Sequence, residues 1–187
     1  MKLKYNAPAV LTFTFLSAAV LVLSLTILPS LTEDWFFIRG RGSFLPSRPQ
    51  SWVTLFTHVM GHANWDHFLS NFAFILLIGP ILEEYYSSLR LLLMMVITAL
   101  VTGLLNVLLF PTGLLGSSGI VFMMILLASF TNINKGEIPL TFILILVLYL
   151  GREFINSFSN NNISQFTHMV GGFCGSLFGF FKPYKGK

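Results

Sequence analysis

Long apolar stretches alternate with polar connections along most of the chain. The stretches cover approximately residues 8–28, 67–82, 89–110, 118–131, 138–150 and 166–181. Because a helix rises about 1.5 Å per residue, about 20 apolar residues cross the core of a bilayer. Several stretches are shorter than this, the fourth most clearly. A short helix is tolerated inside a bundle, because its ends contact protein instead of lipid. The pattern predicts an all-α polytopic membrane protein, with six transmembrane helices in a single domain of residues 1–187.

The connection between the first two stretches, from about residue 29 to about residue 66, is unusually long. It contains Trp35, Trp52, three arginines and three prolines. Tryptophans are enriched where a membrane meets water, and a long connection in a compact domain usually has structure of its own. We expect a structured loop in the membrane interface.

Composition excludes the main soluble classes. Hydrophobic residues make up 55% of the chain and charged residues 10%, and the mean hydropathy is +0.78. A soluble domain carries about 25% charged residues. The single cysteine, Cys174, excludes a disulfide scaffold. The net charge of +4 comes from lysines and arginines at the ends and in loops, which excludes a nucleic-acid-binding stripe.

The first apolar stretch follows Lys2 and Lys4, as the apolar part of a signal peptide would. It is too long for that role and no small-residue cleavage site follows it, so we expect a retained helix. Six spans place both termini on one side, with seven basic residues there and four on the other. Positive charge favours the cytoplasmic side, so both termini are expected in the cytoplasm of a bacterial or archaeal cell. The two groups are Lys2, Lys4, Arg90, Lys135, Lys182, Lys185 and Lys187 inside, and Arg39, Arg41, Arg48 and Arg152 outside.

Polar side chains in three of the spans form the candidate site, because polar groups inside a membrane are costly. Ser118 opens the fourth span, within Gly116-Ser117-Ser118-Gly119. His67 and Asn71 are four residues apart on one face of the second span, and His168 comes early in the sixth. The second, fourth and sixth spans run in the same direction across the membrane. Their first turns, and therefore these four side chains, are expected in one layer.

This layer has the chemistry of a serine hydrolase. A serine hydroxyl needs a base to take its proton, and the ordinary pKa of a histidine, about 6.5, suits His168 to that role. The start of a helix presents unpaired N–H groups to a developing oxyanion at Ser118. Asn71 and His67 would add donors worth about 3–4 kcal/mol each. We place Asp66 and Glu153 in loops, so a Ser118–His168 dyad without a carboxylate, cofactor or metal is expected.

Glycines bring the dyad together. They recur every four residues along the sixth span, at Gly171, Gly175 and Gly179. Such a ridge lets two helix backbones approach closely, and it lies on nearly the same face as His168. Gly116 permits a sharp turn before Ser118, and Gly119 a close helix contact after it.

These motifs resemble those of the rhomboid family of intramembrane proteases. Gly116-Ser117-Ser118-Gly119 resembles the G-x-S-G nucleophile motif, and the segment from His67 to Asn71 resembles the H-x-x-x-N motif. His168-Met169-Val170-Gly171-Gly172 resembles the segment around the family's catalytic histidine. His58 and His62 have the family's histidine spacing, and Glu83 matches an acidic residue at the inner end of the second helix. The resemblance covers a catalytic core of about residues 52–181. It implies a six-helix bundle that cleaves transmembrane proteins in or near their membrane-spanning segments.

The chain departs from the family pattern at two positions. Val53 follows Trp52 where many rhomboids have arginine, and Phe122 stands where many have a tyrosine that stacks on the catalytic histidine. Phenylalanine keeps the stacking surface and loses the hydroxyl. The partners expected are transmembrane substrates and the lipid bilayer, and nothing in the sequence specifies an oligomeric state.

Several alternatives stay open. Ser117 is a rival nucleophile, and Asn71 could serve only as an interhelical hydrogen bond. His58 and His62 are better explained as structural residues than, with His67, as zinc ligands. Glu83 and Glu84 are interpreted as solvated side chains at the inner surface, without a catalytic role. A non-catalytic relative that binds transmembrane segments, and a sorting-type rhomboid that trims C-terminal tails, are the alternative functions.

Overall fold

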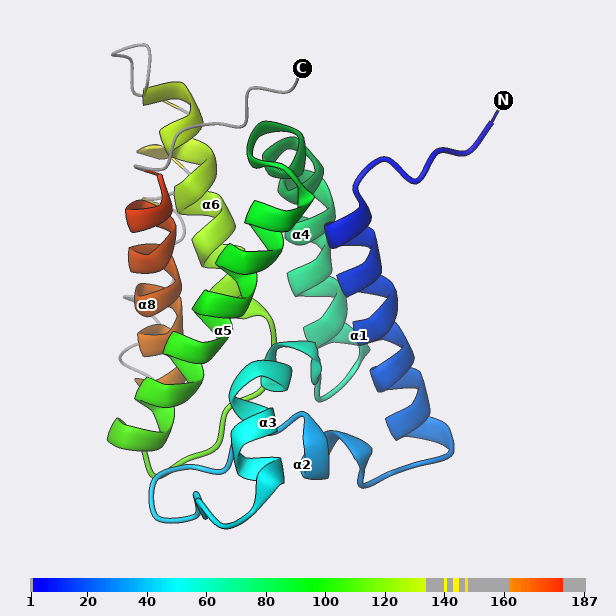
Figure 1. Ribbon diagram of the computed structural model, residues 1–187, viewed down its shortest axis with the longest axis vertical. Helices are drawn as coiled ribbons and strands as arrows, with labels where there is room; N and C mark the ends of the chain where they lie inside the picture. The colour runs from blue at the N-terminus through cyan, green and yellow to red at the C-terminus, as the bar shows by residue number, and fades with distance from the viewer. Residues whose placement is uncertain (1, 134–139, 141–142, 145–146, 148–161, 180–187) are drawn as a thin grey trace.

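The computed structural model describes residues 2–133, 140, 143–144, 147 and 162–179. The described part of the chain is helical, as predicted, and its helices are joined by short turns and loops (Figure 1). The helices are α1 (Pro8–Thr26), α2 (Leu31–Trp35), α3 (Pro49–Thr57), the 3-10 turn η1 (His58–Met60), α4 (Trp65–Tyr86), α5 (Ser88–Leu109), α6 (Ser118–Ile133) and α8 (Asn162–Phe178). The fifth predicted span, 138–150, falls mostly outside the described residues, so the count of six spans stays a prediction.

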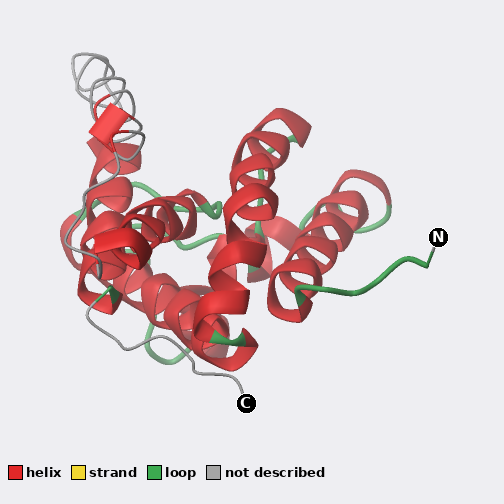
Figure 2. Ribbon diagram, turned by 90° about the horizontal axis from the view of Figure 1, so that it is seen from above, coloured by secondary structure: helices red, strands yellow, loops and turns green. Residues whose placement is uncertain are grey.

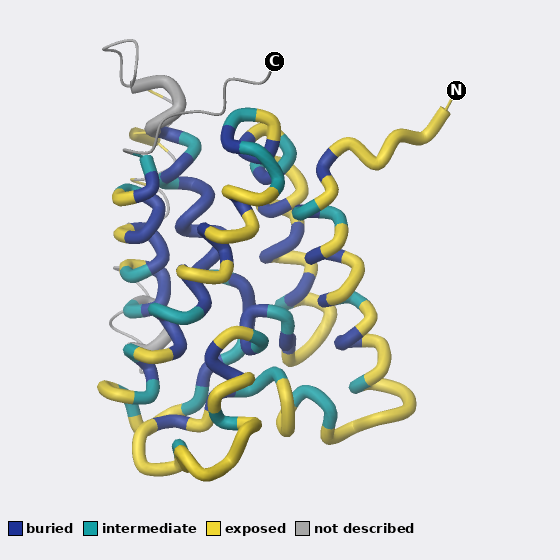
Figure 3. Tube along the Cα trace, viewed as in Figure 1, coloured by how far each residue is buried: buried dark blue, intermediate teal, exposed yellow. Residues whose placement is uncertain are grey.

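Among the described residues, three helices, α1, α4 and α5, are long and apolar enough to cross a membrane. The apolar part of α6, Ser118–Ser129, is shorter. It packs against α4, α5 and α8, and its residues from Ile120 to Ile125 are buried on every side. Figure 3 shows this helix as the most continuously buried part of the fold. A helix that is apolar on all sides is expected inside a bundle. This position agrees with the explanation given above for the short length of the fourth predicted span.

The chain from 29 to 66 is structured, as predicted, and lies at the end of the bundle opposite the N-terminus (Figure 1). A pair of backbone hydrogen bonds of 2.9 Å joins Ile38 to Leu114 and so ties this loop to the segment before α6. Trp52 donates from Nε1 to the carbonyl of Pro46 at 2.9 Å. Trp52 keeps an exposed fraction of 52%, as aromatic residues at a membrane interface do.

The interpretation of Glu83 as a solvated side chain was wrong. Glu83 is only 5% exposed, and its two carboxylate oxygens accept from the N–H groups of Ala9 and Val10 at 2.9 and 3.0 Å. The first N–H groups of a helix lack partners within it and favour negative charge, so this carboxylate stabilises the start of α1. Gly79, one turn earlier in α4, lets Val10 pack directly on the helix, because a Cβ there would lie 2.7 Å from the valine side chain.

Two predicted helix starts were also wrong. Helix α4 begins at Trp65, because the Asn64 side chain accepts from the N–H of His67 at 2.8 Å and caps it. Asp66 therefore lies in the first turn of a helix and not in a loop, where its charge favours the helix dipole. Helix α8 begins at Asn162, four residues before the predicted start at Phe166. His168 is thus about two turns into its helix instead of in the first turn.

Candidate active site

Ser118 is the first residue of α6 and follows a sharp turn at Gly116. Gly116 has a φ of +108°, a conformation that side chains disfavour, and its N–H donates to the carbonyl of His58 at 2.9 Å. The carbonyl of Ser117 accepts the N–H of Val121 at 3.0 Å, the first bond of the helix. Ser118 therefore stands at a helix start, where backbone N–H groups are available to an anion.

The two serines of the motif differ in their surroundings. Ser117 is completely buried and its Oγ lies 3.3 Å from His62 Nε2, whereas Ser118 is half-buried. The other ring nitrogen of His62, Nδ1, lies 3.2 Å from the carbonyl of Met60. A carbonyl oxygen can only accept a hydrogen bond, so we assign the ring proton to Nδ1. Nε2 then accepts a hydrogen bond from the Ser117 hydroxyl. The Ser117 hydroxyl is thus committed to His62 and out of reach of a substrate, which favours Ser118 as the nucleophile.

Burial, followed by the neighbouring His67, lowers the pKa of His62 to about 4. The ring therefore stays neutral at physiological pH and keeps its Nε2 as an acceptor for Ser117. The His62 and His67 rings meet edge to face, with centroids 5.0 Å apart. His62 thus connects the turn that carries the two serines with the start of α4.

His168 lies against α6, one helical turn beyond Ser118. Its ring stacks on Phe122, with centroids 4.3 Å apart and planes 13° from parallel. Phe122 follows Ser118 by one helical turn, so both side chains are on one face of α6. The residue before His168, Thr167, also reaches α6, since a Cβ on Gly119 would lie 3.2 Å from its methyl group. The expectation that Phe122 keeps the stacking surface is confirmed.

At Gly171 and Gly175, the glycine ridge of α8 is confirmed as the contact with α6. A Cβ on Gly171 would lie 2.1 Å from the carbonyl oxygen of Gly119. A Cβ on Gly175 would lie 2.2 Å from the carbonyl oxygen of Met123. In both places the obstacle is backbone, which cannot move aside as a side chain can. At Gly172, one position away, the nearest atoms are in the Leu126 side chain at an ordinary 3.6 Å.

His67 lies where α4 meets the turn before Ser118, and Asn71 follows one turn later in α4. A Cβ on Gly116 would lie 2.6 Å from His67 Nε2, so the imidazole rests directly against this glycine. Asn71 is 6% exposed, and its Nδ2 donates to the carbonyl of His67 at 3.0 Å. An amide group has two N–H donors, and this bond uses one of them. Sequence reasoning foresaw neither the Gly116–His67 contact nor this bond within the helix.

The surroundings of His58 agree with its interpretation as a structural residue. It is 1% exposed, its Nδ1 lies 3.2 Å from the carbonyl of Thr54, and its Nε2 lies 3.5 Å from Thr102 Oγ1. Burial lowers its pKa to about 4. Through its own carbonyl it also holds Gly116. Within the described ranges, the structure contains no group of three histidine, cysteine, aspartate or glutamate side chains arranged for a metal ion.

Comparison with known protein families matches residues 49–185 to the rhomboid domain. The match covers most of the chain, from the start of α3 past the end of α8, and the chain belongs to the rhomboid family. No curated protein matches the chain. The candidate residues Ser118, His168, His67 and Asn71 all lie inside the matched region, whereas α1 lies before it.

Proposed function

We propose that this protein is an intramembrane serine endopeptidase that uses a Ser118–His168 dyad. The stacking of His168 on Phe122, one turn beyond Ser118, is the observation that carries the proposal. It brings a base to the face of α6 that bears the nucleophile. The backbone contact at Gly171 supports this placement, because it fixes the spacing of the two helices.

The reaction follows from these positions. The Ser118 hydroxyl adds to the carbonyl carbon of the scissile peptide bond while its proton passes to His168. The oxyanion that forms is stabilised by the Ser118 backbone N–H, by His67, which rests against Gly116, and by Asn71, one turn further along α4. His168 then returns the proton to the leaving amine, and the C–N bond breaks. Water, deprotonated by His168, hydrolyses the acyl-enzyme and restores Ser118.

Phe122 has an orienting role in this mechanism. In a triad, a carboxylate holds the histidine in position. Here a stacked ring restricts the imidazole plane and contributes about 0.5–1.5 kcal/mol beyond its buried area. No cofactor enters the reaction, so a chelator such as EDTA should leave the rate unchanged.

Membership of a family that contains serine proteases supports the activity, and the apolar surfaces of α1, α4 and α5 support a multi-pass membrane protein. In the topology we propose, with six spans, both termini lie in the cytoplasm. Ser118 then lies beyond the middle of the membrane, on the side of the loop that carries Trp52. The substrates would be membrane proteins whose spanning segments end near this depth.

A cleavage assay tests this function. Purified protein in detergent would be incubated with a panel of tagged single-span membrane proteins, and the products sized by mass spectrometry. We expect cuts in or near the spanning segment with wild type and none with Ser118→Ala. Binding of panel members by both forms, without cleavage by either, would instead identify a non-catalytic escort. Cuts confined to C-terminal tails would identify a sorting-type enzyme.

A further inference from the structure

An apolar groove runs between α1 and α5, on the side of the molecule away from α8. It encloses a cavity of about 480 Å³. Its walls include Thr12 and Leu16 of α1, and Leu92, Val96 and Ala99 of α5. A membrane supplies only apolar occupants at this depth, and the groove faces it.

The length of the groove matches one leaflet of a bilayer. It extends from Pro8 to Leu16 along α1, about 12 Å at 1.5 Å per residue. Half of a bilayer core is about 15 Å thick. Phe56, Val59 and Met60, from α3 and η1, stand at its far end. A transmembrane helix is about 10–12 Å wide and crosses about 30 Å, so it does not fit, whereas a single acyl chain does.

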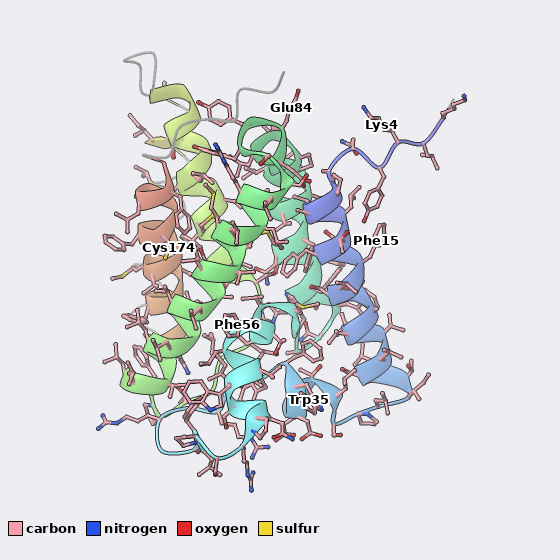
Figure 4. All side chains as sticks on the ribbon, in the orientation of Figure 1. Lys4, Phe15, Trp35, Phe56, Glu84 and Cys174 are labelled. Carbon is pink, nitrogen blue, oxygen red and sulfur yellow. The ribbon has the colours of Figure 1, made fainter. Side chains whose placement is uncertain are left out.

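The open end of the groove leads to a polar mouth. Ser88 lines both the groove and an adjoining cavity of about 380 Å³ that is also lined by Lys4, Asn6 and Glu84. Figure 4 shows Lys4 and Glu84 at the same end of the bundle, beside the start of α1. Glu83 also lines this cavity, but its carboxylate is engaged by the N–H groups of α1.

The mouth therefore offers one cationic and one anionic side chain to a ligand. A zwitterionic headgroup with a phosphate and a primary ammonium complements this pair, because the phosphate accepts from Lys4 and the ammonium donates to Glu84. The choline headgroup carries a cation without N–H donors, and the glycerol headgroup lacks a cation. The chemistry thus favours an ethanolamine phospholipid over these two.

The inner wall of the groove belongs to the elements that hold the candidate active site. Ile120, two residues after Ser118, lines it together with Val59 and Met60. The carbonyl of Met60 is the partner of His62 Nδ1. An acyl chain in the groove would therefore pack behind the turn that carries Ser117 and Ser118.

We propose that this groove and its polar mouth bind one phosphatidylethanolamine molecule from the leaflet on the side of the N-terminus. One acyl chain fills the groove and the headgroup lies between Lys4 and Glu84. Binding lowers the free energy of the folded state and does not depend on whether the protein is a protease. Figure 2, viewed along the bundle from this side, shows α1 set apart from the α6–α8 pair, with the other helices between them.

Lipid binding to delipidated protein in detergent tests the proposal. Native mass spectrometry would count bound lipids while phosphatidylethanolamine, phosphatidylcholine or phosphatidylglycerol of equal chain length is added, and thermal unfolding would be followed in parallel. We expect one ethanolamine lipid to be retained at least 10-fold more tightly than the others and to raise the Tm.

Matched variants distinguish lipid binding in the groove from lipid binding elsewhere on the membrane-facing surface. Val96 and Ile97 are neighbours on α5 with exposed fractions of 40% and 44%, and only Val96 lines the groove. Val96→Phe should abolish the tight binding and the Tm shift, whereas Ile97→Phe should retain both. Lys4→Gln and Glu84→Gln should reduce the headgroup preference, and Lys2→Gln should not. Equal retention of all three lipids, or equal effects of the two phenylalanines, would mean ordinary surface lipid and overturn the proposal.

Discussion

The contact between α6 and α8 and the space between α1 and α5 are built in opposite ways. At Gly171 and Gly175, backbone rests on backbone, and even a methyl group would collide with a carbonyl. Between α1 and α5, side chains leave a cavity of about 480 Å³. The first contact fixes the distance between the proposed nucleophile and base, and the second makes no such demand. Within one bundle, the helices pack most closely where the proposed catalytic residues must be held at a fixed distance. Between α1 and α5, where no such distance is required, the packing leaves a cavity that faces the membrane.

The largest effect should come from Gly171→Val. The valine side chain would meet the Gly119 carbonyl, which cannot rotate away, so α8 must move away from α6. We expect loss of activity together with a fall of several degrees or more in the Tm in detergent. Gly172→Val is the matched control, because only a flexible leucine side chain lies nearby. Similar behaviour of the two variants would show that the contact does not discriminate between positions.

Removing a proposed oxyanion donor should have the next largest effect. His67→Ala and Asn71→Ala should each lower kcat by about 10- to 1000-fold with smaller changes in KM, because these donors act mainly on the transition state. Steady-state cleavage of one substrate at several concentrations measures both constants. Wild-type turnover in both variants would return these residues to a purely structural role, such as the bond from Asn71 to the His67 carbonyl.

Acid should weaken the fold through His58 and His62. Both stay neutral in the folded protein, where burial lowers each pKa to about 4, while the unfolded chain protonates near pH 6.5. Protons then favour the unfolded state, so stability is complete above about pH 6.5 and falls as the pH drops towards 4. Between pH 7 and 5 the loss is about 2 kcal/mol per histidine.

Thermal unfolding in detergent at these pH values measures the loss. His62→Gln should remove about half of the pH dependence, because Gln does not titrate in this range. A Tm that stays constant from pH 7 to 5 would contradict the neutral, buried state of both rings.

The smallest effect is expected at the Ser117–His62 pair. A buried neutral hydrogen bond contributes about 1 kcal/mol net, so Ser117→Ala should slow turnover by less than about 10-fold. The double variant with His62→Ala should lose little more than His62→Ala alone, because the two residues act through one contact. Strictly additive losses in this cycle would mean that the two side chains do not act together.

The stacking surface at Phe122 was expected from the resemblance to rhomboids, whereas local patterns in the sequence predicted most of the described helices and the glycines of α8 that contact α6. These features depend on residues three or four positions apart, whose relation a helix fixes in advance. The contacts that were missed join distant parts of the chain. Glu83 caps a helix that starts 75 residues before it, at Pro8, and Ser117 pairs with a histidine 55 residues earlier.

The Glu83 error has a simple cause. A carboxylate in the last turn of a helix near the membrane surface has the same sequence pattern whether it meets water or the N-terminus of a neighbouring helix. Only the packing of α1 on α4, through Val10 and Gly79, distinguishes the two. The shared depth of Ser118 and His67 could be predicted, because helix direction sets depth. The direct contact of His67 with Gly116 required the path of the loop.

Labelling with a fluorophosphonate probe in detergent tests the Ser118–His168 dyad most directly, because the probe reacts only with an activated serine. Wild type should be labelled, and so should Ser117→Ala, whose missing hydroxyl is buried against His62. Ser118→Ala and His168→Ala should remain unlabelled while unfolding at temperatures close to wild type. Labelling that persists in Ser118→Ala, or disappears in Ser117→Ala alone, would place the nucleophile elsewhere and contradict the account.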